Sequence, residues 1–192
     1  MLGLILMFCC IGSIFAQTPG IGQCPYVESA SSFNITKFYG RWYENRRSIP
    51  NFFETETKCV KINYSASEND KVQIVKHRIS SITGRESVLE GSAVVDSPSC
   101  RGSPLNCSKF VYTFSVPILG SFDLSYWILD TDYNSYALVY SCNEILGAHY
   151  KYLWVLTRES TPSDSVLDAV NNAIAKNELQ NLPLLTVDHS CE

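Results

Sequence analysis

Gly40-Arg41-Trp42-Tyr43-Glu44 is the most informative stretch of this chain, because two distant pieces give it a structural meaning. Thr131-Asp132-Tyr133 lies between two later strand-like runs, and Arg158 closes the last such run just before a helical pattern. Side chains of these types in this order predict a barrel whose end is filled by the Trp42 indole, with the Arg158 guanidinium stacked over the ring.

Eight strand-like runs account for most of the chain beyond an irregular lead. They cover residues 40–49, 57–66, 71–79, 85–95, 109–116, 123–130, 135–142 and 151–158. Several of these runs alternate apolar and polar residues, and turn-forming residues separate them. Short strands at even spacing are typical of an up-and-down β-barrel or a β-sandwich.

A single helix is predicted after the eighth run, with Thr161 as its N-cap and Pro162 in its first turn. Its apolar stripe consists of Val166, Leu167, Val170, Ala173 and Ile174. One helix after eight strands favours a barrel over an immunoglobulin-like sandwich. The expected fold is therefore all-β, an eight-stranded antiparallel up-and-down barrel with one C-terminal α-helix packed outside. Residues 184–188 are expected to add a short edge strand.

The pieces at residues 40–44, 131–133 and 158 resemble the three signature regions of the lipocalins. Other stretches are similar to the apolipoprotein D group of that family and its insect relatives of the Lazarillo and bilin-binding type. These stretches are Asn63-Tyr64-Ser65, Tyr126-Trp127-Ile128-Leu129 and Tyr136-Ala137-Leu138-Val139-Tyr140-Ser141-Cys142. The resemblance implies a secreted carrier of a small hydrophobic ligand. It also makes Gly40, Trp42, Thr131, Asp132, Tyr133 and Arg158 structural signature residues.

Residues 1–16 are almost wholly apolar and end at Ala16, which predicts a secretory signal peptide cleaved before Gln17. The alternative is an uncleaved anchor, although the segment is short for a membrane span of about 20 residues. Residues 17–192 are expected to form a single domain outside the cell. The formal net charge of −4, with scattered Lys and Arg, provides no basic surface for nucleic acid.

Of the eight cysteines, Cys9 and Cys10 lie in the predicted signal peptide, which leaves six. An even number in an exported chain predicts disulfides, and six cysteines allow 15 pairings. By proximity alone, Cys100 and Cys107 are expected to close their own loop. The resemblance implies the other two pairs, Cys24–Cys142 and Cys59–Cys191, while the Cys100/Cys107 pair departs from the pattern of the apolipoprotein D group.

Three Asn-X-Ser/Thr sequons, at Asn34, Asn63 and Asn106, are candidate glycosylation sites. Chance occurrence is an equally good explanation for each. Asn106 is the weakest candidate if Cys107 is bridged early. The cysteine and histidine spacings fit no zinc motif, so no metal site is expected.

The strand alternation, with its phase set by the resemblance, turns one row of side chains from each strand into the barrel. From this row the predicted ligand-binding residues are Tyr64, Ile74, Lys76, Arg78, Leu89, Phe114, Tyr126, Val139, Tyr152 and Trp154. The alternative is that these side chains only fill a core. We accept that alternative near Trp42 and expect a cavity in the open half of the barrel.

Lys76 and Arg78 are unusual because the same alternation points two cations into the barrel. They are expected to pair with a ligand carboxylate, or else to extend to solvent. An acidic neighbour such as Glu44 or Glu90 would also offset the cost of burying a cation.

Apolar residues are predicted at the tips of three loops at the open end, in Ile49-Pro50-Asn51-Phe52-Phe53, Pro117-Ile118-Leu119-Gly120 and Ile145-Leu146-Gly147. Gathered at one rim they would form an apolar patch for peripheral contact with a membrane or lipoprotein. The alternative is that Phe52 and Phe53 fold down as a lid over the cavity.

No Gly-x-Ser-x-Gly, His-Glu-x-x-His or phosphate-loop motif is present, and all six remaining cysteines are expected in bridges. The chain is therefore expected to be a carrier of a fatty acid, sterol or other lipid, and not an enzyme. The alternatives are a pigment carrier for biliverdin or carotenoid, a lipocalin-type isomerase, and a secreted interaction protein with a filled barrel. No cofactor is expected apart from a bound lipid or biliverdin.

Overall fold

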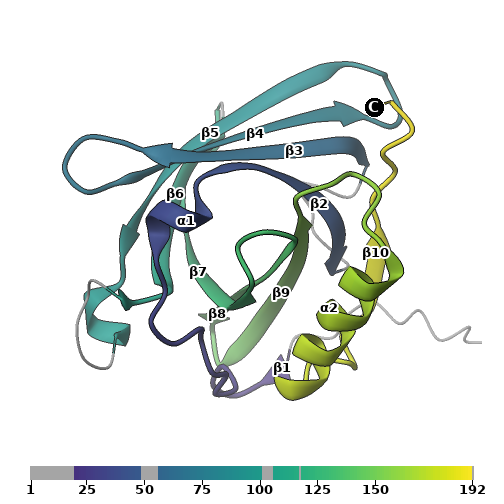
Figure 1. Ribbon diagram of the computed structural model, residues 1–192. Coiled ribbons are helices and arrows are strands. Elements are labelled where there is room, and N and C mark those ends of the chain that lie inside the picture. Colours follow the sequence, from purple (N-terminus) through teal and green to yellow (C-terminus); the bar gives the residue numbers. More distant parts are fainter. Residues whose placement is uncertain (1–19, 49–55, 101–105, 117, 192) are drawn as a thin grey trace, which may run out of the picture.

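The computed structural model describes residues 20–48, 56–100, 106–116 and 118–191, which form one antiparallel sheet that closes on itself (Figure 1). The strands are β1 (Gly20–Ile21), β2 (Gly40–Ser48), β3 (Thr57–Ala66), β4 (Val72–Ser80), β5 (Glu86–Val95), β6 (Lys109–Val116), β7 (Gly120–Thr131), β8 (Tyr136–Ile145), β9 (Ala148–Thr157) and β10 (Leu184–Thr186). The helices are α1 (Ile35–Phe38), the 3-10 helix η1 (Ser97–Ser99) and α2 (Asp164–Lys176).

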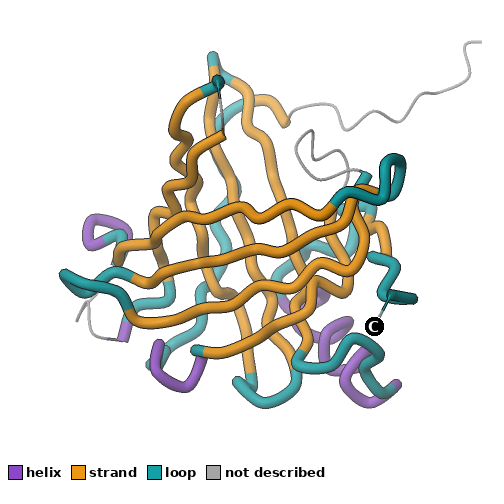
Figure 2. Tube along the Cα trace, turned by 90° about the horizontal axis from the view of Figure 1, so that it is seen from above, coloured by secondary structure: helices purple, strands orange, loops and turns teal. Residues whose placement is uncertain are grey.

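Strands β2 to β9 form the barrel, and each pairs with its neighbour in chain order. The barrel closes because β9 also pairs with β2, with Tyr43 opposite Thr157 and a β-bulge between Glu44 and Arg46. Two short strands extend the sheet, β1 beside β9 and β10 beside β2. Seen from above, one group of strands runs across the other, as in a tilted barrel (Figure 2). The predicted eight-stranded up-and-down barrel is confirmed.

The barrel wall separates two apolar cores because successive side chains of a strand point to opposite faces. The inner core contains Trp42, Tyr64 and Trp154 among its buried members. The outer core lies between β7–β9 and α2, where Tyr140 of β8 and Ile174 of the helix are both buried. Figure 1 shows α2 along the outside of the barrel, which is where the sequence placed it.

Helix α2 begins later than the sequence predicted. Its N-cap is Ser163, so Thr161 does not cap the helix and Pro162 precedes it. The Ser163 carbonyl accepts the first helical bonds, from the N–H groups of Val166 (3.0 Å) and Leu167 (3.1 Å). Asp164 then occupies the first turn, where a carboxylate interacts favourably with the helix dipole.

Near the open rim, the predicted strands were too short. Strands β8 and β9 continue to a two-residue turn at Leu146 and Gly147, because the ladder between them extends to the Ile145–Ala148 pair. The sequence also missed β1 and the short helix α1. Asn34 caps α1, since its Oδ1 accepts the N–H groups of Thr36 (3.0 Å) and Lys37 (3.3 Å).

Three disulfides join Cys24 to Cys142, Cys59 to Cys191 and Cys100 to Cys107, the pairs that the resemblance and the sequence proximity implied. The Cys59–Cys191 bridge ties the C-terminal segment to β3. The predicted signal peptide, residues 1–16, lies outside the described residues. Within the described ranges, no helix has the length and apolar character needed to span a bilayer.

Candidate ligand-binding site

A column of stacked side chains fills the closed end of the barrel. The Arg158 guanidinium carbon lies 3.8 Å from the centroid of the Trp42 ring, and the Phe38 ring also stacks on Trp42, with the ring centroids 4.9 Å apart. Trp42 is fully buried, and its Nε1–H donates to the Phe38 carbonyl at 2.9 Å. The plug (Phe38, Trp42 and Arg158) therefore leaves no room for a ligand at this end.

Arg158 also joins separate segments of backbone around the plug. Its guanidinium donates to the carbonyl of Tyr133 (3.0 Å), to that of Arg41 (2.7 Å), and to three carbonyls of the α1 region. Gly40 has φ +99°, and a Cβ there would lie 3.3 Å from Arg158 Nη1. The positive φ therefore favours glycine here, and a Cβ would in addition press on the guanidinium.

The signature residues Thr131, Asp132 and Tyr133 shape the turn that supports this plug. Asp132 Oδ1 accepts the N–H groups of Asn134 (3.1 Å), Ser135 (2.8 Å) and Tyr136 (3.0 Å). Partial burial alone would raise the pKa of Asp132, but the hydrogen bonds from Ser135 and from these backbone groups lower it on balance. The turn is therefore held by an ionised carboxylate at neutral pH.

Above the plug, a continuous arc of aromatic rings covers the interior faces of β6, β7 and β9. In order, the rings are Phe122, Phe114, Tyr112, Tyr126, Trp154 and Tyr152, with neighbouring centroids 5.3–6.1 Å apart. Gly91 on β5 makes room for this arc, because a Cβ there would lie 2.5 Å from the Tyr112 ring. One wall of the interior is therefore aromatic.

A cavity of about 60 Å³ lies between this arc and the opposite wall. The described residues that line it are Glu44, Ile62, Ile74, Lys76, Leu89, Tyr112, Phe114, Leu124, Tyr126 and Trp154. The sequence had selected six of these as ligand-binding residues. It omitted Glu44, Ile62, Tyr112 and Leu124, although each lies an even number of residues from a side chain already placed inside.

The other four predicted ligand residues lie away from this cavity. Tyr64 lines a gap of about 10 Å³ farther down, among the rings of Phe33, Phe38 and Phe110. Val139 is fully buried in the inner core. Tyr152 and Arg78 are partly exposed and do not line the cavity.

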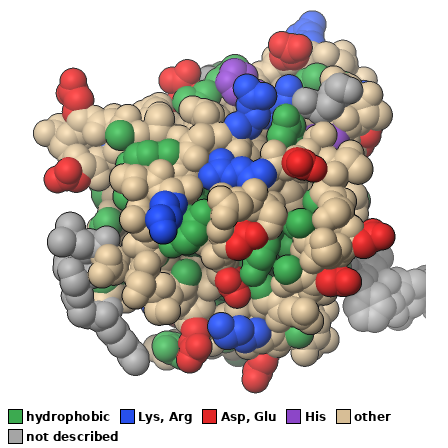
Figure 3. Space-filling model, viewed as in Figure 1, with side chains coloured by type: hydrophobic (Ala, Val, Ile, Leu, Met, Phe, Trp, Pro, Cys, Tyr) green, Lys and Arg blue, Asp and Glu red, His purple; other side chains and the backbone are tan. Residues whose placement is uncertain are grey.

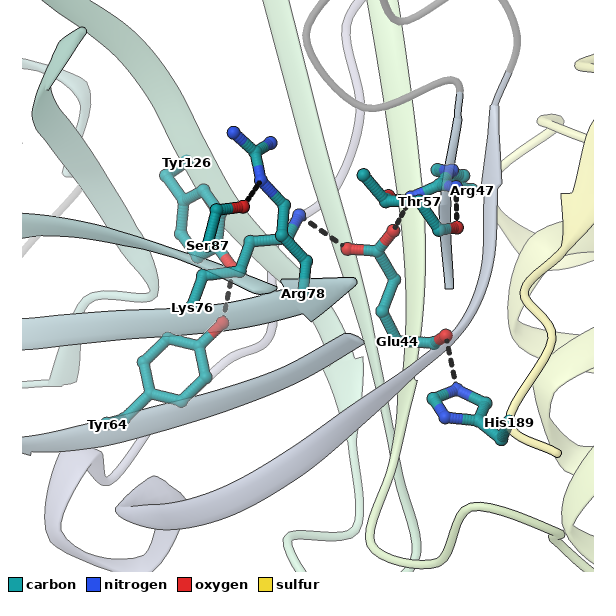
Figure 4. Close-up of polar contacts among 9 residues, drawn as sticks. All are labelled: Glu44, Arg47, Thr57, Tyr64, Lys76, Arg78, Ser87, Tyr126 and His189. Atoms are coloured by element: carbon teal, nitrogen blue, oxygen red, sulfur yellow. Dashed lines mark hydrogen bonds and ion pairs between the residues drawn. The ribbon is translucent and has the colours of Figure 1, made fainter. Parts of the chain in front are cut away.

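Tyr64 and Tyr126 mark the boundary between the filled and hollow parts of the barrel. They come from β3 and β7, and their hydroxyl groups form a short hydrogen bond (Figure 4). Tyr126 lines both the cavity and the gap below it. Burial, reinforced by the nearby Tyr64, raises the pKa of Tyr126 well above its usual value, so this hydroxyl stays protonated.

Glu44 is the counter-charge of Lys76. Its Oε2 lies 2.7 Å from Lys76 Nζ, and its Oε1 accepts from Arg47 Nη1 at 2.9 Å (Figure 4). All three side chains are buried. His189 Nε2 donates to the Glu44 carbonyl at 3.0 Å and so fixes the backbone of β2 at this point. Of the outcomes that the sequence left open for Lys76, the structure selects an acidic neighbour, Glu44, whereas Glu90 is exposed on β5.

Arg78 lies on β4 beyond Lys76, and its Nε donates to Ser87 Oγ at 3.2 Å (Figure 4). Its side chain is partly exposed. The two predicted interior cations therefore differ, since Lys76 belongs to a buried ion cluster whereas Arg78 is accessible to solvent.

Apolar side chains are exposed at two hairpin tips of the open end. Ile118 and Leu146 are completely exposed, and Leu119 and Ile145 are more than half exposed. The predicted third loop, residues 49–53, lies outside the described residues, and so does Pro117. Away from these tips the surface is mixed, and Figure 3 shows acidic and basic side chains interspersed over one face.

A larger groove, of about 1050 Å³, lies outside the barrel between residues 26–32, the η1 region and the end of α2. Its lining is largely polar, with Glu28, Asp130, Lys109 and Lys176 around it. Ligand pockets are usually concave and mostly apolar, so the smaller interior cavity is the better candidate site.

Comparison with known proteins agrees with this architecture. Residues 33–187 match the family profile described as a lipocalin-like domain. The chain is 30% identical over 201 residues to apolipoprotein D of Macaca fascicularis, covering 98% of this chain and 96% of that protein. The chain belongs to the lipocalin family. This lipocalin is also 29% identical over 163 residues to the Lazarillo protein of Schistocerca americana, covering 84% of this chain and 70% of that protein.

Solved structures show the same fold as this lipocalin. Insecticyanin from the tobacco hornworm Manduca sexta superposes with a TM-score of 0.77, at 23% identity and with 90% of each chain covered. Lobster apocrustacyanin A1 superposes with a TM-score of 0.73, at 20% identity, covering 91% of this chain and 92% of that chain.

Proposed function

We propose that this lipocalin is an extracellular carrier that buries a small hydrophobic molecule, such as a fatty acid, sterol or other lipid, in the open half of its barrel. The observation that carries the proposal is the division of the interior into a plugged end and an aromatic cavity above it. Removing apolar ligand surface from water would supply about 25 cal/mol per Å² before ordering costs.

The cavity volume sets a condition on this proposal. About 60 Å³ is well below the roughly 300–1,000 Å³ of pockets that hold drug-sized ligands. A lipid would therefore have to displace lining side chains, and Leu89 and Leu124, the partly exposed members of the lining, are placed to move first. The same small volume favours the second candidate function, a secreted interaction protein whose barrel carries no cargo.

Native mass spectrometry of the protein secreted by its natural source separates these two functions. A carrier should release a bound small molecule on denaturation, and the protein should bind a fluorescent fatty acid with a stoichiometry near one. A colourless protein with a released lipid supports lipid transport, and visible absorbance supports the pigment alternative of biliverdin or carotenoid. A protein that carries nothing and binds no fatty acid would overturn the carrier proposal.

The exported location is supported by the three disulfides, which form and persist in oxidising compartments. Because all six described cysteines are paired, none of them supplies the free thiol that a lipocalin-type isomerase would need. N-terminal sequencing of the secreted protein should start at Gln17. The sequon residues Asn34, Asn63 and Asn106 are all exposed, and mass mapping would show which of them carry glycans.

We also propose that the hairpin tips at the open end contact a lipid surface. Ile118 has φ +72° and Leu146 has φ +53°, a region that costs a β-branched or bulky side chain energy and that Asn adopts more readily. Both positions thus combine backbone strain with full exposure of an apolar side chain. Such strain at exposed sites is typical of functional positions.

The test is co-sedimentation with phosphatidylcholine vesicles. Leu146→Asn should relieve the strain, leave the barrel as stable or more stable, and weaken vesicle binding. The control is Val94→Thr, which removes exposed apolar surface from the end of β5 at the opposite, closed end of the barrel. Equal vesicle binding by the wild type and Leu146→Asn would refute the contact.

The partly exposed Arg78 leads us to expect that a ligand carboxylate lies near the mouth. Because Lys76 is already paired with Glu44, only Arg78 is expected to attract the ligand carboxylate. The preference of the protein for acidic over neutral ligands should therefore be small. Arg78→Gln should weaken binding of a fatty acid by about 0–1 kcal/mol, the range for exposed ion pairs, and should leave binding of the corresponding alcohol unchanged. Equal weakening of both ligands would show that Arg78 shapes the mouth and does not recognise charge.

A further inference from the structure

The side chain of Tyr126 forms part of the floor of the cavity. It is 8% exposed and projects from β7 to the place where the cavity meets the filled core. Below it, Tyr64 packs edge-on against Phe38 at 5.0 Å, and Phe38 continues into the plug. The inner end of a ligand that entered from the open rim would therefore meet the Tyr126 side chain.

The Tyr126 hydroxyl keeps hydrogen-bonding capacity beyond its bond to Tyr64. A phenol offers one donor and acceptor lone pairs. Among the described residues, its hydrogen-bond partner is the Tyr64 hydroxyl. If Tyr64 donates in this bond, the Tyr126 O–H remains available to another group. If Tyr126 donates, a lone pair on its oxygen remains available. Polar groups this deeply buried are usually fully hydrogen-bonded, because an unmet donor or acceptor costs free energy.

The charged groups that line the cavity, unlike this hydroxyl, are paired with groups of opposite charge. Lys76 and Glu44 face each other at 2.7 Å, and Arg47 holds the second carboxylate oxygen. A ligand carboxylate at the floor would have to compete with the Glu44 carboxylate for the buried cations Lys76 and Arg47. A neutral ligand oxygen at the floor needs only a hydrogen bond to the Tyr126 hydroxyl. Burial raises the pKa of Tyr126, so its hydroxyl stays protonated at neutral pH and can donate to a ligand oxygen when Tyr64 is the donor in their shared hydrogen bond.

We propose that Tyr126 is a specificity-determining residue, which selects hydrophobic ligands whose buried end carries a neutral oxygen, a hydroxyl or a carbonyl. This inference rests on the proposed carrier function. It assigns polarity to the inner end of the ligand, whereas Arg78 acts at the mouth. Tyr64 has an opposing role, because its hydroxyl competes with the ligand for the Tyr126 hydroxyl.

The experiment compares two probes of nearly equal size, 2-naphthol and 2-methylnaphthalene, by displacement of a bound fluorescent fatty acid. The measured quantity is the ratio of their dissociation constants, which cancels changes in cavity shape that affect both probes. In Tyr126→Phe the preference for naphthol should fall by about three- to tenfold, the value of one neutral hydrogen bond. Tyr64→Phe frees the Tyr126 hydroxyl and should keep or increase the preference.

Tyr140→Phe is the matched control, because Tyr140 is a buried tyrosine on the outer side of the wall, in the core under α2. It should leave the ratio unchanged. An unchanged ratio in Tyr126→Phe, with both probes bound, would overturn this inference and leave the carrier proposal standing. A decrease of the preference in Tyr64→Phe would also overturn it, even if Tyr126→Phe did not fold. A wild-type protein that binds neither probe nor the fatty acid would overturn both proposals.

Discussion

Replacing Trp42 by alanine should cost about 4–5 kcal/mol of unfolding free energy. Truncating a buried tryptophan costs about 3–5 kcal/mol in lost burial and cavity formation, including its hydrogen bond to Phe38. The stacked Arg158 places Trp42 in the upper part of this range, because a cation over an indole is worth about 0.5–2 kcal/mol. Domains of this kind are stable by only about 5–15 kcal/mol, so the variant should be close to unfolding at room temperature.

Guanidinium unfolding of the oxidised protein, followed by far-ultraviolet circular dichroism, measures this loss without relying on tryptophan emission. Trp42→Phe should lose only about 1–2 kcal/mol, because a ring still stacks on Arg158 and Phe38 while the Nε1–H bond is missing. Trp127→Ala is the control, since Trp127 is partly exposed on the outer wall, and it should lose about 1–2 kcal/mol. A loss below about 1 kcal/mol in Trp42→Ala would refute the role of the plug.

Three further outcomes follow from the site. Ligand binding should quench tryptophan emission and Trp154→Phe should remove most of the response, because Trp154 lines the cavity; unchanged quenching would place Trp154 outside the site. Glu44→Gln should cost about 3–5 kcal/mol in chemical denaturation, since it leaves two buried cations without their carboxylate, whereas the exposed Glu90→Gln should cost little. Burial and the nearby charge of Asp130 raise the pKa of Tyr136 to about 12. Burial also raises the pKa of Tyr140 to about 12. The unfolded chain loses these protons first, so stability should fall as pH rises from about 10 to 12, which pH-dependent melting would show.

Sequence reasoning was most successful where the information is local. The inward rows of side chains followed from an alternation of period two within each strand, with the phase set by the resemblance to the lipocalins. Six of the ten predicted ligand residues do line the cavity, Trp154 and Phe114 among them. The helix start was wrong because Thr161 and Ser163 are both good N-caps, and the choice depends on where the chain leaves β9.

Contacts between strands that are not neighbours could not be derived in the same way. Glu44 and Lys76 come from β2 and β4, with β3 between them, and they meet only because of the register and tilt of the whole barrel. The hydrogen bond between Tyr64 and Tyr126 spans the interior from β3 to β7. Each of these pairs requires the backbone positions of several strands at once.

The amino-acid sequence by itself therefore determined the strands, because their alternation and turn residues are short-range patterns, and the resemblance of its motifs to the lipocalins set the plug and the inward face of each strand. Only the tertiary structure decided that Glu44 neutralises Lys76, that Tyr126 forms part of the floor, and that about 60 Å³ remains free above it. The physical reason is that a cavity is the small difference between the barrel volume and the volume of the rings that fill it. That difference depends on all rotamers and on the shear of the barrel together, and no local pattern encodes it.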